Sequence, residues 1–228
     1  MSLNHSLASL TGDSASPDLW NAFLADFRPP VDADDIGLGG VSVGNLEQAD
    51  DTVLFSLSPA GLQQKLNYTW QYCSLNFVLI NIVKTMAMIF GCISKNISPT
   101  MFHLNGVPIK FTDEYTYVGL TFVSNAVNIF TKHYTIKATK ARSIANVTFT
   151  LDSFIGSLPP FQGKRLYNAR VDPHLTSACE VALDVNLPLL ALLQKVQHTF
   201  LCRLLGLNPR SMRAMLFSET GVAPLAYR

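Results

Sequence analysis

The chain has 228 residues and a formal net charge of +1, and 48% of its residues are hydrophobic while only 14% are charged. At this length it can form one large domain or two small ones, and a charged fraction below the roughly 25% of typical soluble domains suggests a surface that a partner covers. Because the N-terminus lacks the features of a signal peptide and the most apolar run, residues 77–91, is too short to span a bilayer, we expect an intracellular protein, nuclear or cytoplasmic, not secreted and without a membrane segment.

The first predicted element is a helix over residues 16–27. Ser16 occupies an N-cap position, Pro17 follows at the first helical position, and apolar residues then recur every four positions. Residues 28–40 contain a Pro pair, three Asp and a Gly pair, which break this periodicity. They predict a loop.

A hairpin and a second helix follow. Residues 45–49 and 52–56 are short apolar runs, close enough to pair as antiparallel strands with Asp50 and Asp51 at the turn. Residues 58–76 repeat the Ser-Pro helix start and carry one apolar face, which predicts a helix.

Strand patterns continue to about residue 125. Residues 77–80 and 86–90 are strand-like, and residues 103–111 predict a hairpin with Asn-Gly at its turn. Residues 115–122 predict one strand, in which Gly119 suggests a bulge or a close backbone approach. We expect these strands to share a sheet with the helices.

The rest of the chain is predicted to be helical. Residues 133–156 end at a glycine, residues 163–183 are interrupted by Pro173, and residues 186–206 have an Asn cap, an early Pro and a Gly stop. The sequence thus predicts an α+β fold with a boundary near residue 128.

Charge changes sign between the two predicted parts, residues 1–128 and residues 129–228. Residues 1–51 hold nine acids and one base, whereas residues 132–170 hold seven bases and one acid. An acidic part that holds cations and a basic part that holds phosphates suit a protein that handles polyanions. Two solvated faces are the alternative.

The pair Asp50-Asp51 has three interpretations. Asp favours turns, so the pair can be a solvated turn. An acid/base pair of the glycosidase kind needs carboxyl groups about 5 Å or more apart across a substrate, which sequence neighbours rarely supply. A divalent-metal site needs clustered carboxylates, and a tight turn anchored by apolar strands can present one.

Several motifs follow one another in a fixed order along the chain. A Gly-x-x-x-Ser-Pro helix start precedes Ala-Asp-Asp, a helix, an Asn-x-x-Lys-Thr run and a Tyr-Val-Gly-Leu strand; the residues concerned are Gly12, Ser16, Pro17, Asp50, Asp51, Asn81, Lys84, Thr85, Tyr117 and Gly119. This order of motifs resembles the reverse transcriptases of LINE-type, non-LTR retrotransposons. Residues 200–212 and 216–228 are similar to the family's segment after the palm. The resemblance covers nearly the whole chain.

The resemblance implies an RNA-directed DNA polymerase that transfers nucleotides with two divalent metals, Mg²⁺ or Mn²⁺. Residues 1–128 would be the C-terminal half of a palm, an antiparallel sheet with helices on one face, and residues 129–228 a helical thumb. Asp50 and Asp51 would be catalytic metal ligands, and Lys84 would act near the triphosphate as a catalytic residue.

The same resemblance assigns the remaining candidate residues. Gly12, Ser16 and Pro17 would frame the incoming nucleotide and template, and Tyr117 and Gly119 would grip the primer. The nucleic-acid backbone would be bound by Lys137, Lys140 and Arg142. The implied partners are an RNA template, a DNA primer and deoxynucleoside triphosphates.

Each of these residues also has a structural alternative. Lys84 can extend from an apolar strand to solvent, Tyr117 can be core packing, Gly119 a bulge without a ligand, and Ser16 and Pro17 a helix cap alone.

Two departures from the family pattern bear on activity. Gln48 stands where the family usually carries an aromatic residue. In the family the fingers and the strand with the first catalytic Asp precede the motif that opens with Gly12, where this sequence has eleven residues. We therefore expect a missing N-terminal polymerase half as a partner; the alternative is a catalytically inactive retroelement remnant or a nucleic-acid-binding module.

Overall fold

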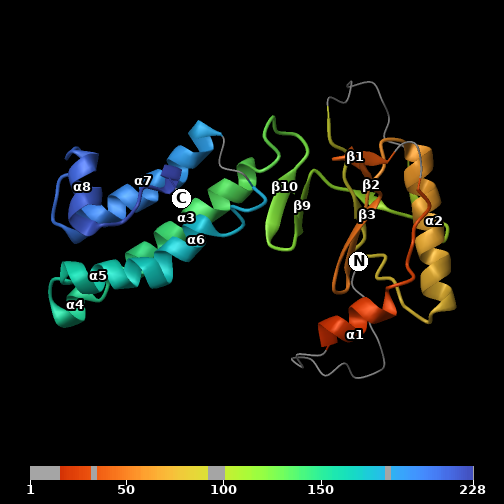
Figure 1. The fold of residues 1–228 in the computed structure, drawn as a ribbon, viewed down its shortest axis with the longest axis horizontal. Helices are drawn as coiled ribbons and strands as arrows, with labels where there is room; N and C mark the ends of the chain where they lie inside the picture. The colour runs from red at the N-terminus through yellow and green to blue at the C-terminus, as the bar shows by residue number, and fades with distance from the viewer. Residues whose placement is uncertain (1–15, 32–34, 92–100, 183–185, 228) are drawn as a thin grey trace. The chain divides into compact units, whose positions relative to one another are not determined.

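The structure is a computed structural model that describes residues 16–31, 35–91, 101–182 and 186–227. It divides into two compact units, unit 1 (Met1–Asp113) and unit 2 (Glu114–Arg228), which we describe separately (Figure 1). The α+β class predicted from the sequence is confirmed. No helix in the described ranges is long and apolar enough to cross a membrane.

In the described part of unit 1, a helix and two consecutive β-hairpins precede a long helix. The elements are α1 (Ser16–Phe23), β1 (Ile36–Leu38), β2 (Val41–Val43), β3 (Asn45–Gln48), β4 (Asp51–Leu54) and α2 (Pro59–Leu75). The pairs β1–β2 and β3–β4 are antiparallel. The predicted hairpin around the Asp pair and both predicted helices are confirmed, although α1 ends four residues earlier than predicted.

The β1–β2 hairpin begins within residues 28–40, the segment that was predicted to be a loop, and β2 follows that segment. Its turn is Gly39-Gly40, and both glycines have positive φ angles, +59° and +83°. Positive φ at both central residues is the signature of a type I′ hairpin turn, which glycine adopts without steric cost. The Gly pair between short apolar runs was therefore a hairpin signal.

Both ends of α2 are fixed by hydrogen bonds between residues close in sequence. The Ser58 hydroxyl accepts a hydrogen bond from the Gly61 amide at 3.1 Å, and Pro59 opens the helix. At the other end Phe77 adopts φ +57°, and the Val78 amide donates to the Cys73 carbonyl at 2.8 Å. This Schellman-type end prevents residues 77–80 from forming the predicted strand, since only Ile80 makes a bridge.

The remaining strands in the described part of unit 1 are two residues long: β5 (Met86–Ala87), β6 (His103–Leu104), β7 (Val107–Pro108) and β8 (Lys110–Phe111). β6 and β7 form the predicted hairpin, with Asn105 and Gly106 both at positive φ, and β5 pairs with β8 in parallel. Among the described residues every sheet has two strands, so the shared sheet predicted for this part is not found. Unit 1 instead packs two small apolar clusters against α2.

Unit 2 opens with a hairpin of β9 (Glu114–Tyr117) and β10 (Leu120–Val123). The single strand predicted over residues 115–122 is wrong, because Val118 and Gly119 take φ angles of +47° and +78° and reverse the chain. Gly119 is thus a turn residue, not a bulge. Leu120 is part of the helical core, so this hairpin belongs with the helices and the units divide after Asp113, earlier than the predicted boundary.

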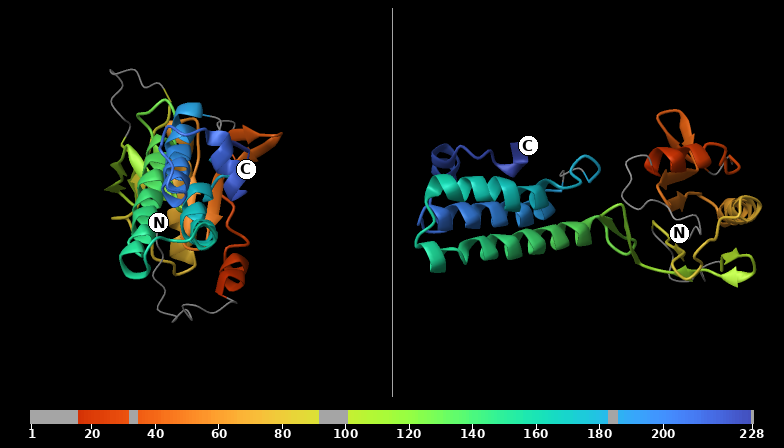
Figure 2. Two further views of the ribbon diagram at one scale, coloured as in Figure 1. Left: turned by 90° about the vertical axis from the view of Figure 1, so that its left-hand side faces the viewer. Right: turned by 90° about the horizontal axis from the view of Figure 1, so that it is seen from below.

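Long helices of unit 2 run side by side around one apolar core (Figure 2). The elements are α3 (Thr131–Phe149), α4 (Asp152–Ile155), α5 (Pro160–Leu166), η1 (Tyr167–Val171), α6 (Asp172–Thr176), α7 (Leu187–Leu204), α8 (Arg213–Thr220) and η2 (Leu225–Tyr227). The rings of Phe149, Tyr167 and Phe200 meet in the core at centroid distances of 4.8 and 5.2 Å.

The predicted interruption at Pro173 takes the form of a π-helical turn. η1 lies directly before Asp172 and Pro173, and α6 continues after it. A π turn lets the chain accommodate a proline that cannot donate to the preceding turn. The Asn186 side chain caps α7 by accepting from the Leu189 amide at 3.1 Å, as its Asn-x-Pro start predicted.

Candidate functional site

The candidate carboxylates lie at the tip of the β3–β4 hairpin. The register pairs Gln48 with Asp51, so the turn residues are Ala49 and Asp50, and Asp51 is the first residue of β4. Asp50 is exposed and Asp51 is half-buried. The hairpin therefore presents the two carboxyl groups at the end where its strands are joined.

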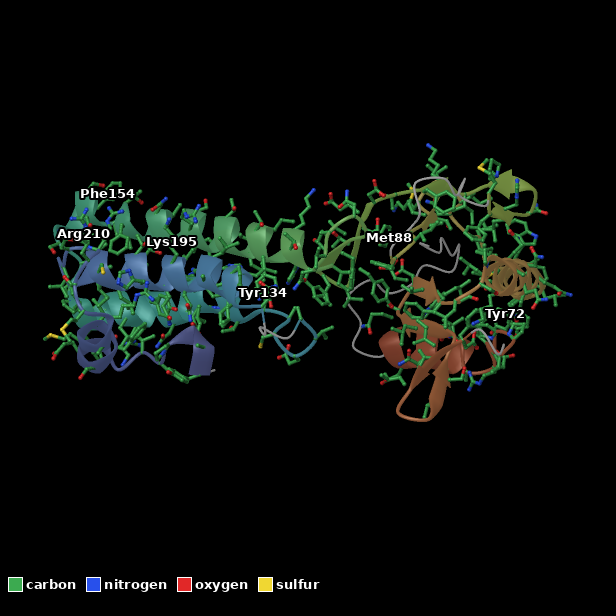
Figure 3. All side chains as sticks on the ribbon, turned by 90° about the horizontal axis from the view of Figure 1, so that it is seen from above. Tyr72, Met88, Tyr134, Phe154, Lys195 and Arg210 are labelled. Carbon is green, nitrogen blue, oxygen red and sulfur yellow. The ribbon has the colours of Figure 1, made fainter. Side chains whose placement is uncertain are left out.

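The two faces of this hairpin differ. Thr52 lines a small apolar pocket with Tyr72 and Cys73 of α2, where Tyr72 is labelled in Figure 3, and Leu54 packs against a cluster that includes Leu66 of α2. Side chains alternate along a strand, so Asp51 lies on the face opposite to Thr52. Packing against α2 thus anchors β4 without burying the Asp51 carboxylate.

Helix α1 is tied to the turn itself. The indole nitrogen of Trp20 donates a hydrogen bond to the Ala49 carbonyl, and the Trp20 ring stacks on Phe23 with centroids 5.6 Å apart. Ala49 has φ +52°, an uncommon angle for a non-glycine residue. Sequence reasoning did not single out Trp20, because nothing local links it to a turn 29 residues away.

A divalent cation fits the chemistry of these two side chains, since carboxylate oxygens are the ligands that Mg²⁺ and Mn²⁺ prefer. Within the described part of the chain, no group of three or more His, Cys, Asp or Glu side chains forms a metal cluster. Asp50 and Asp51 are therefore the two metal ligands that the tip of the hairpin can supply.

A further carboxyl group lies on the same hairpin. Burial raises the pKa of Glu47, and this shift is opposed by the charge of Arg28 and by a hydrogen bond from the side-chain Nδ2 of Asn45 at 2.6 Å. Glu47 pairs with Thr52, so it lies on the face opposite to Asp51.

Lys84 lies on an exposed turn of unit 1. Its backbone amide donates to the carbonyl and side-chain oxygens of Asn81, both at 3.2 Å, and the Thr85 hydroxyl donates to the Asn81 carbonyl at 3.0 Å. The Asn-x-x-Lys-Thr run is thus a turn that Asn81 organises. No hydrogen bond or ion pair joins Lys84 to Asp50 or Asp51 in the described residues.

The residues predicted to frame the nucleotide are only partly described. Gly12 lies outside the described residues. Helix α1 begins at Ser16 and continues through Pro17, as predicted, and their side chains are not among those the structure describes.

The residues predicted to grip the primer belong to the β9–β10 hairpin of unit 2. Tyr117 is half-buried at the end of β9, opposite Leu120, and Gly119 is exposed in the turn.

The three predicted backbone-binding residues of α3 have different environments. Lys137 is 5% exposed, its ammonium donates to the Ser177 carbonyl at 2.7 Å, and it lies 5.4 Å from the ring centroid of Tyr134, which is labelled in Figure 3. Lys140 and Arg142 are exposed. Of the three predicted backbone-binding residues, Lys137 is therefore buried inside unit 2, and Lys140 and Arg142 lie on its surface.

The charge asymmetry follows the division into units. Residues 1–113 carry ten acidic and five basic side chains, a formal charge of −5, whereas residues 114–228 carry six acidic and twelve basic ones, a charge of +6. The carboxylate hairpin thus belongs to an acidic unit and the exposed bases of α3 to a basic one.

Comparison of the chain with protein-family models, with curated proteins and with solved structures finds no match.

Proposed function

We propose that this chain carries the metal-binding hairpin and the duplex-binding helices of a nucleotidyltransferase of the reverse transcriptase kind. The reaction would extend a DNA primer on an RNA template with deoxynucleoside triphosphates. The observation that carries the proposal is the hairpin itself, which presents Asp50 and Asp51 at its tip. Strand β4 packs on α2, and Trp20 donates a hydrogen bond to the turn.

The proposed roles follow from the chemistry of each side chain. Asp50 and Asp51 would hold Mg²⁺ or Mn²⁺, which supplies Lewis acidity to the attacking hydroxyl and charge neutralisation to the pyrophosphate when bound. Lys84, an exposed cation, would interact with the triphosphate, and Ser16, Pro17, Tyr117 and Gly119 would contact nucleotide, template and primer by resemblance. The fingers and a further aspartate would come, by the same resemblance, from a segment outside these residues.

A second candidate function is nucleic-acid binding without catalysis. The observation that favours it is the charge of +6 on unit 2 together with the exposure of Lys140 and Arg142 on α3. Such bases bind phosphates of any sequence and release counterions, so binding weakens as salt rises.

Metal binding tests the first function. Titration of the full chain with Mn²⁺, followed by electron paramagnetic resonance, should show a bound ion, and Asp50→Asn with Asp51→Asn should weaken its affinity about tenfold or more. Asp113→Asn removes an exposed acid elsewhere in unit 1 and should leave the affinity unchanged. Equal affinities in all three proteins would refute the metal-binding hairpin.

Duplex binding tests the second function. In a fluorescence anisotropy titration with an RNA–DNA primer-template, Lys140→Gln with Arg142→Gln should lower the affinity. It should also reduce the magnitude of the slope of log affinity against log salt by about one to two, which corresponds to one or two lost phosphate contacts. Lys132→Gln is the matched control on α3, because the Lys132 ammonium already pairs with Glu114. Binding that is salt-independent would count against both functions.

A further inference from the structure

A lysine is buried on the face of α2 that packs against the hairpins. Lys65 is 1% exposed, and its ammonium pairs with the carboxylate of Asp35 and donates to the Phe55 carbonyl at 2.8 Å. A buried charge is tolerated only where it is paired and hydrogen-bonded. Lys65 therefore connects α2 to two segments that precede it in the chain.

One of these segments is the β1–β2 hairpin. Asp35 directly precedes β1 and is buried, and its second carboxylate oxygen accepts a hydrogen bond from the hydroxyl of Ser42 on β2 at 3.2 Å. The Asp35 carboxylate thus links the residue that precedes β1 to β2.

The other segment is the base of the β3–β4 hairpin. Phe55 follows β4, and its amide donates to the Gly44 carbonyl at 2.8 Å, which closes the hairpin just before β3. A Cβ added to Gly44 would lie 2.6 Å from the Lys65 ammonium and 3.1 Å from the Asp35 carboxylate. The ammonium accordingly occupies the space that the absent side chain of Gly44 leaves.

We propose that Lys65 is a positioning residue for Asp50 and Asp51. Its ammonium holds the Phe55 carbonyl at the base of the hairpin, while packing of β4 on α2 carries the constraint to the tip. Apolar packing is non-directional, whereas a hydrogen bond from the ammonium constrains both the position and the orientation of the Phe55 carbonyl. The role of the two aspartates rests on the proposed function; the restraint on the hairpin does not.

The restraint is tested by hydrogen exchange with four versions of the full chain. Lys65→Met removes the ammonium, and Asp35→Leu with Lys65→Met replaces the pair by apolar side chains, a change that often preserves stability. Lys110→Met, at an exposed lysine of β8, is the control. The double variant keeps the test valid if Lys65→Met alone fails to fold.

In the folded double variant, amides of residues 51–55 should exchange about tenfold faster or more than in the wild-type chain, while amides within α2 exchange as before. The control should match the wild type throughout. Unchanged exchange at residues 51–55 in the double variant would overturn the positioning role.

Mn²⁺ titration of the same proteins separates this inference from the proposed function. If both hold, the double variant binds Mn²⁺ about tenfold more weakly than the wild type although it retains the two aspartates. If the wild type binds no Mn²⁺ at the aspartates but exchange accelerates, the proposed function fails and the restraint stands. If the double variant binds Mn²⁺ as tightly as the wild type while Asp50→Asn binds it more weakly, the positioning role fails and the metal site stands.

Discussion

The indole nitrogen of Trp20 donates a hydrogen bond to the carbonyl oxygen of Ala49, which joins the first turns of α1 to the turn that carries Asp50. The helix and the hairpin that the motif order associates with nucleotide and metal are thereby connected directly. Ala49 has a positive φ, which costs free energy in a residue with a Cβ, and a hydrogen bond to its carbonyl helps to offset that cost.

Replacement of Trp20 by Phe should lower the free energy of unfolding by about 1 kcal/mol. Phe retains an aromatic ring that can stack on Phe23 but lacks the donor, so the Ala49 carbonyl loses its partner in α1. Urea denaturation followed by circular dichroism measures the change. Phe23→Leu removes the stacking and keeps the indole donor; if it is destabilising while Trp20→Phe costs nothing, the ring contact and not the hydrogen bond stabilises the turn.

Replacement of Phe77 by Gly should raise the free energy of unfolding by up to about 1 kcal/mol. Phe77 ends α2 at φ +57°, and its side chain is 88% exposed, so glycine relieves backbone strain at little cost in packing. The matched control is Phe77→Ala, which removes the ring but keeps the Cβ. Chemical denaturation should place only the glycine variant above the wild type, and a gain from alanine as large as that from glycine would contradict the strain explanation.

Replacement of Gly163 by Ala should destabilise unit 2 by about 1–3 kcal/mol. Gly163 lies where α5 approaches α7, and an added Cβ would overlap the Leu204 side chain and lie 3.2 Å from a methyl carbon of Leu158. A double-mutant cycle locates the clash: in a Leu204→Ala background the same change should cost less. Equal costs in both backgrounds would show that Leu204 is not the obstacle.

Unfolding free energy should fall as pH decreases below about 6.5 because of His198. Burial, and then the charge of Arg213, lower the pKa of His198 below its ordinary value of 6.5. Between the ordinary and the lowered pKa the unfolded chain binds a proton that the folded chain does not, so the stabilisation is complete above pH 6.5 and is lost on acidification.

Urea midpoints at pH 7.5 and pH 5.5 measure this dependence. The midpoint should drop less in His198→Gln than in the wild type, because the glutamine does not titrate. Arg213→Gln should reduce the drop in part by removing the second cause. A drop that is the same in all three proteins would assign the pH dependence to other groups.

Local chemistry made several elements of this fold predictable. The Ser58-Pro59 start of α2, the Asn186 cap of α7 and the Asn105-Gly106 turn each depend on a few adjacent residues, and all three were confirmed. The β3–β4 hairpin was predictable for the same reason, since its turn and its apolar runs are contiguous.

The errors came from local signals that allowed two structures. Gly119 within residues 115–122 was interpreted as a bulge or a close backbone approach, yet Val118 and Gly119 form a turn whose hairpin is stabilised by the burial of Leu120 and Val123. The predicted shared sheet failed because strands of two to four residues pair only in twos in the described part of unit 1.

The amino-acid sequence by itself determined the starts of α2 and α7, the turns of the β3–β4 and β6–β7 hairpins, and the separation of acids and bases along the chain, because these properties reside in neighbouring residues or in composition. Only the tertiary structure decided which charges are inside. Lys65 was not singled out and Lys137 was predicted to bind the nucleic-acid backbone, but in the structure their ammonium groups contact Asp35 and the Ser177 carbonyl, 30 and 40 residues away. A buried cation depends on a partner that folding brings to it, and no local pattern encodes that distance.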